Sequence, residues 1–320
     1  MQYAYLGRTG VKVSVVCLGT MTFGKEADEA TSAALMDHAF ETGVNFFDTA
    51  NIYNQGVSEE IIGRWMGARR DAIVLASKVH FPTGDGVNDR GSSRRHIMLS
   101  VEQSLGRLKT DRLDLLYLHH WDADTALDES LAALTTLVEQ GKILYCGVSN
   151  FSAWQTVKAN ATAAARGYAP VVCIQPMYNL VKRQAEVEIL PMALEEGLGV
   201  CPYSPMGAGL LSGKYERGEE GRLKQNEMYK KRYKQGEYWS ATEAFVKYAR
   251  QSGDSPAALA VAWVVHHPAV TSAIVGARNI EQLSESMKCV EVDMGADRRA
   301  EITALSPAPP PATDRTESMA

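Results

Sequence analysis

Residue types that transfer protons follow several short apolar segments of this 320-residue chain. Asp48 and Tyr53 follow one such segment, and Lys78 lies near the end of the next. A lysine at the end of a buried strand needs an anion beside its ammonium group, and Asp48 is the nearest candidate. The Lys78 ammonium group also favours the phenolate form of Tyr53. We therefore expect the pKa of Tyr53 to be lowered, which would let it act as a general acid at neutral pH. His119, which follows a third segment, would then orient the substrate oxygen.

Each of these side chains alone also fits a structural role, so their joint placement carries the hypothesis. The apolar segments alternate with amphipathic stretches, and the predicted strands are 15–19, 44–47, 72–79, 113–118, 143–148, 171–175, 198–203 and 271–275. Strands that alternate with helices at this spacing predict a parallel sheet. Eight such units, without a GxGxxG motif after the first strand, favour an α/β (β/α)8 TIM barrel over an open doubly wound sheet. In such a barrel the carboxyl ends of the strands surround one mouth, where the four side chains would meet.

Helix starts are indicated by capping signals. Ser152 with Gln155 and Ser240 with Glu243 have capping-box spacing, and Ser255 precedes a proline that suits the first helical position. Each signal predicts a helix that begins at that point.

Three segments lie outside the repeat. Residues 2–14, with a turn signal at 7–10, predict an N-terminal β-hairpin that closes the bottom of the barrel. Residues 215–239 form a long polar insert after the seventh strand, and its path is left open. We expect one barrel domain over 1–305, followed by a Pro-rich, disordered tail at 306–320.

Composition narrows the function. A formal net charge of −5 without a basic block argues against nucleic-acid binding. No apolar stretch reaches about 18 residues and the N-terminal segment lacks a signal-peptide pattern, so we expect a cytoplasmic protein without membrane contact. The five cysteines are scattered and fit buried apolar positions. The adjacent pairs His119-His120 and His266-His267 lack metal-ligand spacing, so no metal is expected.

The chain resembles the aldo-keto reductases. The matching stretches are Gly19 to Gly24, Gly43 to Tyr53, Ser58-Glu59, Lys78, Leu113 to His119, Gly147 to Phe151, Gln175-Pro176, Tyr203 to Lys214, and Gly276 to Arg278 with Gln282. They occur in the family's order over nearly the whole chain. The resemblance implies metal-free reduction of an aldehyde or ketone by NADPH, with Tyr53 as proton donor, Lys78 and Asp48 tuning it, and His119 positioning the carbonyl.

The resemblance also implies which residues bind cofactor and substrate. NADPH/NADP would contact Thr20, Met21, Asp48, Ser149, Asn150, Gln175, Tyr203, Ser204, Pro205, Met206, Gly207, Lys214, Gly276, Arg278, Gln282 and Glu285. The nicotinamide would lie on Tyr203, and Arg278 would pair with a 2′-phosphate, which favours NADP over NAD. A small carbonyl substrate would meet Phe23, Tyr53, His119 and Trp121.

One branch of the superfamily offers an alternative function. Residues 89–97 are similar to the corresponding stretch of potassium-channel β-subunits. That similarity suggests an NADPH-binding regulatory or redox-sensing subunit with slow turnover. Those subunits commonly carry Asn where this chain has His119, which favours an active enzyme. The identity of the carbonyl substrate, the physiological direction and the oligomeric state are left open.

Overall fold

The computed structural model describes residues 1–313 of the chain. Its strands are β1 (Tyr3–Tyr5), β2 (Lys12–Ser14), β3 (Val16–Gly19), β4 (Phe46–Asp48), β5 (Val74–Val79), β6 (Leu113–Leu118), β7 (Ile143–Ser149), β8 (Val171–Gln175), β9 (Gly199–Val200) and β10 (Ala273–Val275). Its helices are α1 (Glu29–Glu41), α2 (Val57–Met66), α3 (Arg94–Leu108), α4 (Leu127–Glu139), α5 (Ala153–Arg166), α6 (Ile189–Glu196), α7 (Arg222–Gln225), α8 (Glu227–Arg232), α9 (Gly236–Gln251), α10 (Pro256–Val265), α11 (Ile280–Met287) and α12 (Ala296–Thr303).

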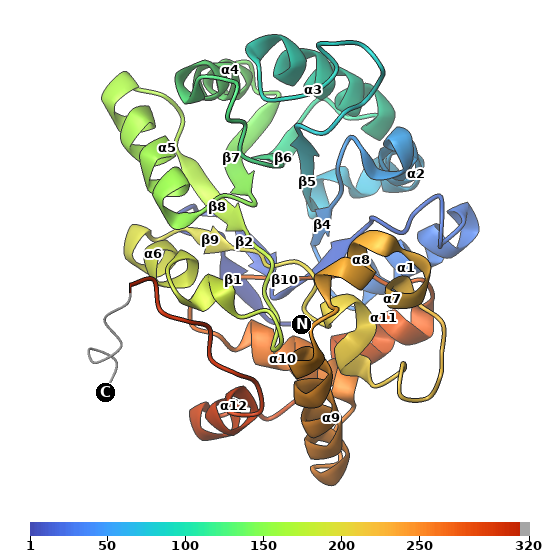
Figure 1. Ribbon diagram of the computed structural model, residues 1–320. Coiled ribbons are helices and arrows are strands. Elements are labelled where there is room, and N and C mark those ends of the chain that lie inside the picture. The colour runs from blue at the N-terminus through green and yellow to red at the C-terminus, as the bar shows by residue number, and fades with distance from the viewer. Residues whose placement is uncertain (314–320) are drawn as a thin grey trace.

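Eight parallel strands form one curled sheet in the order β10-β3-β4-β5-β6-β7-β8-β9, with helices around its outside (Figure 1). Backbone hydrogen bonds also link the two edge strands: the Thr271 amide donates to the Val200 carbonyl at 2.8 Å, and the Ile274 amide to the Pro202 carbonyl at 2.9 Å. The predicted α/β class and all eight predicted strand positions are confirmed. The arrangement is consistent with a (β/α)8 barrel.

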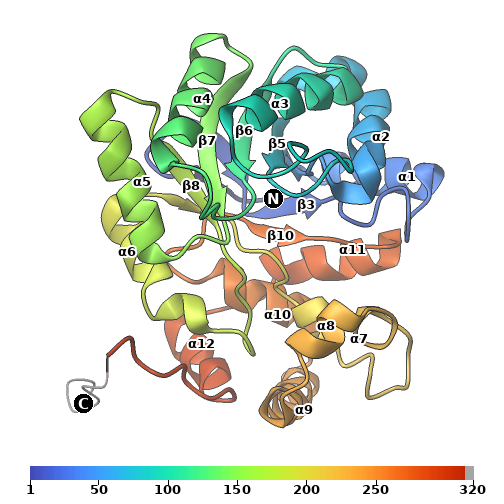
Figure 2. The same cartoon turned by 45° about the horizontal axis from the view of Figure 1, so that its top comes forward.

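The strands are short apolar runs that are buried on both faces, as a parallel sheet covered by helices requires. Outward-pointing strand residues pack against the apolar faces of helices such as α3, α4 and α5, which follow the strands around the sheet (Figure 2). Inward-pointing residues form a separate interior cluster that includes Phe46, Leu115 and Tyr117. Because of this alternation, the inward-pointing residues at the carboxyl end of each strand face the mouth.

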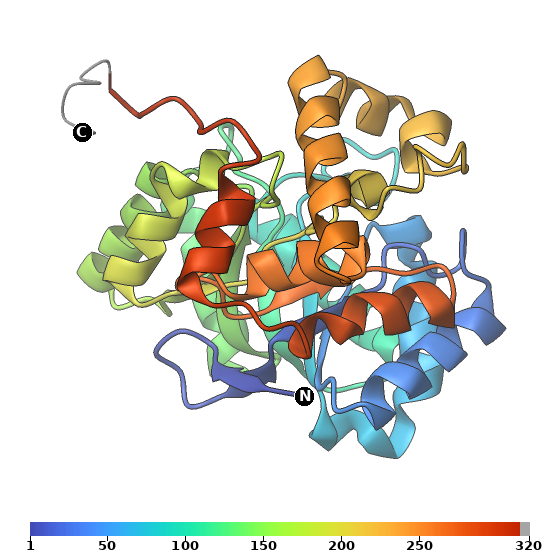
Figure 3. The same ribbon diagram turned by 90° about the horizontal axis from the view of Figure 1, so that it is seen from below.

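The β1–β2 hairpin and the insert lie at opposite ends of the molecule (Figure 3). Leu6 and Val13 of the hairpin segment are fully buried in the interior cluster. The predicted hairpin is therefore confirmed, and it covers the end of the sheet away from Asp48 and Lys78. The insert after β9 contains the short helices α7 and α8 and the first turn of α9.

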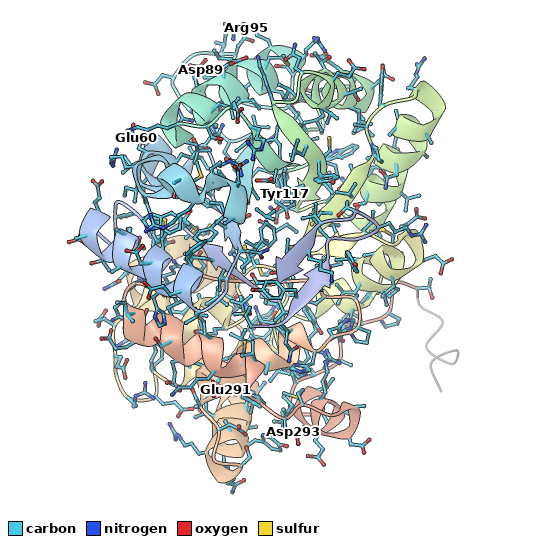
Figure 4. All side chains as sticks on the ribbon, turned by 180° about the vertical axis from the view of Figure 1, so that it is seen from behind. Glu60, Asp89, Arg95, Tyr117, Glu291 and Asp293 are labelled. Carbon is cyan, nitrogen blue, oxygen red and sulfur yellow. The ribbon has the colours of Figure 1, made fainter. Side chains whose placement is uncertain are left out.

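The interior also holds most of the cysteines. All five cysteines are free and buried, as predicted. The Cys173 sulfur forms a hydrogen bond with the Tyr117 hydroxyl at 3.2 Å and lies 3.6 Å from the Cys201 sulfur. Figure 4 shows Tyr117 in the middle of the molecule, whereas Glu60 and Arg95 lie toward its periphery. Burial raises the pKa of the Cys201 thiol well above its ordinary value, so these thiols act as apolar packing groups.

Two capping predictions are confirmed and one is wrong. Ser255 caps α10 by accepting from the Ala258 amide at 3.4 Å, and Pro256 is the first residue of that helix. Ser152 accepts from the Gln155 amide while the Gln155 side chain accepts from the Ser152 amide, which completes a capping box for α5. Ser240, by contrast, lies inside α9, which begins at Gly236. The earlier start follows from packing, because Trp239 in the first turn donates its indole N–H to the Tyr233 carbonyl at 3.2 Å.

The end of the chain is described only in part. Residues 306–313 form no helix or strand, and the Ser306 and Pro307 carbonyls accept from Arg183. The remainder of the predicted disordered tail, 314–320, lies outside the described residues. None of the helices in residues 1–313 combines the length and the apolar character needed to cross a membrane.

The capping analysis makes a stability prediction. Replacing Ser152 with alanine removes the side-chain hydroxyl that accepts from the Gln155 backbone amide, although the bond from the residue 152 backbone amide to the Gln155 side chain can persist, and it should lower the free energy of unfolding by about 1 kcal/mol. Ser240→Ala is the matched control: Ser240 is exposed inside a helix, where alanine is the better helix former, so stability should be unchanged or slightly higher. Urea unfolding followed by circular dichroism measures both. Equal losses in the two variants would contradict the capping assignment.

Candidate active site

The Lys78 ammonium group is the centre of the cluster at the carboxyl ends of β4 and β5. It donates to the Asp48 carboxylate, to the Thr49 carbonyl at 2.7 Å and to the Tyr53 hydroxyl at 3.2 Å. Lys78 and Asp48 are almost fully buried. Three oxygen partners use the three donors of the ammonium group, so the expected pairing of Lys78 with Asp48 and Tyr53 is present.

The charges of this cluster are set by opposing effects. Burial alone would lower the pKa of Lys78, but the Asp48 carboxylate and the Tyr53 oxygen raise it above its ordinary value, so the ammonium group persists. Burial raises the pKa of Tyr53, and the Lys78 charge only partly opposes that rise. The expected lowering of the Tyr53 pKa is therefore wrong in direction, because desolvation of the phenolate outweighs the cation. Tyr53 holds its proton throughout the neutral range.

His119 lies across the mouth from Tyr53, with 6.1 Å between the ring centroids. Its imidazole is 9% exposed, and its Nδ1 atom has no hydrogen-bond partner in residues 1–313. Burial lowers the pKa of His119 well below its ordinary value, and the nearby positive charge of Lys78 adds to the effect. Phe81 packs edge-on against the ring at 4.7 Å. His119 is thus a neutral imidazole held in an apolar setting.

A continuous chain of hydrogen bonds joins the ends of the next strands to this cluster. The Gln175 amide donates to Asp48 at 2.9 Å, and Ser149 donates to the Gln175 carbonyl at 3.0 Å. The Asn150 amide donates to Ser149 and to the His119 carbonyl, and it accepts from the Tyr203 hydroxyl at 2.7 Å. One network therefore links the carboxyl ends of β4, β5, β6, β7 and β8 with Tyr203, which follows β9.

The segment after Tyr203 turns sharply. Ser204 and Ala208 have positive φ angles of 59° and 58°, and Gly207 and Gly209 between and after them are also left-handed. Such turns expose backbone amides on one side and bring the following residues back toward the mouth. Lys214 ends this stretch.

Four half-buried cations surround the mouth without any oxygen acceptor among the described residues: Lys214, Arg222, Arg232 and Arg278. Burial lowers the pKa of Lys214, and the charges of Arg278 and Arg222 lower it further. These three cations therefore lie near one another and repel. Charges held in this way indicate a site for an anion.

The other predicted binding residues have varied settings. Gln282 accepts from the Arg278 amide at 3.2 Å, whereas Glu285 pairs with Lys288 at 2.8 Å. Thr20 is buried, and its hydroxyl donates to the Asp48 carbonyl at 3.1 Å. Phe23 has no exposed surface and packs in the hydrophobic core. The half-buried or exposed members of the predicted set are Met21, Tyr53, Asn150, Tyr203, Ser204, Met206, Lys214, Gly276, Arg278, Gln282, Glu285 and Trp121, and the remaining members are buried.

Several residues at the mouth were missed from the sequence. For Phe81, two positions after β5, only the direction of the side chain was unpredictable, because it belongs to a loop without periodicity. The Thr49 carbonyl acts through the backbone, which residue type does not reveal. Arg222 and Tyr229 belong to the polar insert, where only their types could have drawn attention. Tyr229 is 4% exposed, and its phenol group makes a small contribution to the raised pKa of Tyr53.

Comparison with known proteins agrees with this geometry. The family model for the aldo/keto reductase family matches residues 15–307. The chain is 42% identical to an uncharacterized oxidoreductase of Bacillus subtilis over 97% of each chain. It is 36% identical to a norsolorinic acid reductase of Aspergillus flavus, over 93% of this chain and 79% of that protein. It is also 36% identical to a probable voltage-gated potassium channel subunit beta of Arabidopsis thaliana, over 91% and 92% respectively.

The buried imidazole predicts a pH dependence of stability. Unfolding restores an ordinary pKa to His119, so the unfolded chain binds a proton below about pH 6.5 that the folded protein does not. The contribution of His119 to the free energy of unfolding is therefore intact at neutral pH and falls as the pH drops below that value. His119→Gln should lose less stability than the wild type between about pH 7.5 and about pH 5.5.

Urea unfolding at the two pH values measures this difference. His120→Gln, which removes an exposed imidazole from the next position, controls for a change of surface charge. Identical pH dependence in His119→Gln and the wild type would contradict the assignment of His119 as a neutral buried group.

Proposed function

Because the chain belongs to the aldo/keto reductase family, we propose that it catalyses the NADPH-dependent reduction of an aldehyde or ketone to an alcohol. The observation that carries the proposal is the contact of Lys78 with both Asp48 and Tyr53, beside the neutral His119. A protonated phenol held against a buried ammonium group is suited to donate a proton to an oxygen that gains negative charge.

The residues around the mouth fit the proposed cofactor. Lys214, Arg222 and Arg278 are cations without a carboxylate partner in the described chain, and a phosphorylated ribose would neutralise them. Tyr203 offers an aromatic ring at the catalytic end of the same mouth, and Ser149, Asn150 and Gln175 offer polar groups next to it. When bound, NADPH supplies the hydride.

The protein's own residues divide the remaining work. Tyr53 gives its proton to the carbonyl oxygen, and Lys78 stabilises the phenolate that remains, because the attraction between opposite charges is strong in a buried site. Asp48 keeps Lys78 charged and in place. His119, being neutral, can donate a hydrogen bond to the same oxygen without competing as an acid. Phe81 helps to exclude water from this contact.

The proposal extends to organisation and setting. The hydrogen bonds between β9 and β10 support a closed (β/α)8 barrel, and the family match supports one catalytic domain over 1–305. We place the protein in the cytoplasm with a small-molecule carbonyl substrate. Trp121, which packs against Phe151 at 5.3 Å and Trp154 at 5.5 Å, supports an aromatic wall at the substrate side.

Replacing Tyr53 with phenylalanine tests the catalytic role. The variant should bind NADPH as the wild type does and lose about 100-fold to 10,000-fold of its carbonyl-reduction rate, because only the donated proton is removed. Tyr168→Phe, a half-buried position in the outer layer, should keep full activity. NADPH fluorescence and oxidation across aldehydes and ketones measure both. A wild type as slow as Tyr53→Phe on every carbonyl compound would contradict the enzyme and favour the regulatory alternative.

Replacing Arg278 with alanine tests the cofactor preference. The affinity for NADPH should fall about 10-fold to 100-fold, while that for NADH changes little, because only NADPH carries the 2′-phosphate. Lys224→Ala removes an exposed cation from the insert after β9 and should change neither affinity. Fluorescence titration gives the dissociation constants. Equal catalytic efficiency of the wild type with both cofactors would contradict the NADP preference.

A further inference from the structure

Arg232, the last residue of α8, is a half-buried cation that the proposed reaction does not use. Its guanidinium group lies 5.2 Å from the centroid of the Tyr229 ring and 3.7 Å from the Met228 sulfur. Neither partner carries a negative charge, and no oxygen acceptor reaches the group within residues 1–313. A guanidinium group that is partly desolvated and unpaired is stabilised when an anion binds to it.

The backbone that carries Arg232 is fixed over the mouth. The next residue, Tyr233, is 1% exposed, and its hydroxyl lies 3.3 Å from the Asn179 amide. The same Asn179 amide donates to the Ser204 carbonyl at 2.9 Å, so α8 is linked to the segment that follows Tyr203. The Trp239 indole donates to the Tyr233 carbonyl from the other side. Arg232 is therefore held at a defined place rather than on a free surface.

That place is close to Tyr203, because the Asn179 amide that contacts the Tyr233 hydroxyl also donates to the carbonyl of Ser204, the residue after Tyr203. The charge of Arg232 opposes burial, which raises the pKa of Tyr203 to about 12. Tyr229, against which Arg232 stacks, bears on the pKa of Tyr53. The pKa of Lys214, by contrast, is lowered by burial and by the charges of Arg278 and Arg222. The cations thus form a group of three around Lys214 and a single arginine near the reacting groups.

We propose that Arg232 binds an acidic group on the carbonyl substrate, so that the enzyme prefers aldehydes or ketones that carry a carboxylate. This inference rests on the proposed reductase function. A planar guanidinium fork matches a carboxylate with two parallel hydrogen bonds, and the stacked Tyr229 ring limits the directions from which the anion approaches. The substrate is positioned by its acidic end while its carbonyl group meets Tyr53 and His119.

The test compares an acid with its neutral ester. The wild type should reduce 4-carboxybenzaldehyde with a higher kcat/KM than methyl 4-formylbenzoate. Arg232→Gln should lower kcat/KM for the acid about 10-fold to 100-fold, mainly through KM, and leave the ester's value unchanged. Lys231→Gln is the matched control, because it removes one exposed positive charge from the same helix and should leave both substrates unaffected.

The other outcomes overturn the inference. Equal losses on acid and ester would make Arg232 structural, and no loss on either would remove it from the substrate site. A fall in NADPH affinity, measured by fluorescence titration, would assign Arg232 to the phosphates of the cofactor instead.

Binding gives a readout that does not depend on turnover. Benzoate should bind the NADP⁺ complex of the wild type and of Lys231→Gln, and more weakly that of Arg232→Gln, when measured by calorimetry. Failure to reduce either aldehyde would count against the reductase function alone, because the benzoate result still decides the role of Arg232. If benzoate binds all three proteins with the same affinity, the proposed role of Arg232 is contradicted.

Discussion

A buried ammonium group is the constraint on which the arrangement of this mouth depends. Removing Lys78 from water costs several kcal/mol, and only well-placed acceptors can offset that cost. Asp48, the Thr49 carbonyl and Tyr53 are those acceptors, and they require β4, β5 and the loop that follows β4 to keep their relative positions. The curled sheet supplies that register. Lys78 and its acceptors are therefore positioned by strands whose own burial stabilises the fold.

The same charge determines what the mouth can do chemically. Burial lowers the pKa of His119 and the Lys78 charge adds to that effect, whereas the same charge only partly offsets the desolvation of Tyr53, so the phenol stays protonated. The proposed proton donation at neutral pH would thus come from a phenol that retains its proton, beside a cation that can stabilise the resulting phenolate. The family membership and the local geometry point to the same chemistry on independent grounds.

Much of this could be predicted from the sequence, and the remainder has physical reasons. Strand positions were visible because buried parallel strands are continuous apolar runs, and the Ser152 capping box was visible because its hydrogen bonds are local. The Ser240 prediction was wrong because the contact of Trp239 with Tyr233 extends α9, and such contacts are not local. The direction of the Tyr53 pKa depended on its burial, which residue type does not reveal.

The insert was the least predictable part. Its polar composition gives no periodicity. The helices α7 and α8 therefore depend on tertiary contacts such as that of Tyr233 with Asn179, and these contacts also fix the positions of Arg222 and Arg232. Phe23 shows the converse case, because a residue in a recognisable motif stretch is buried in the core. Sequence motifs located the mouth, whereas the side chains that line it depended on packing.

Isotope transfer tests the central claim most directly. NADPH deuterated at its reactive nicotinamide position would be incubated with the protein and an aldehyde, and the alcohol product would be examined by mass spectrometry. The account predicts one deuterium atom on the former carbonyl carbon. An alcohol without the label, or a protein that binds the labelled cofactor and forms no alcohol from any carbonyl compound, would contradict it.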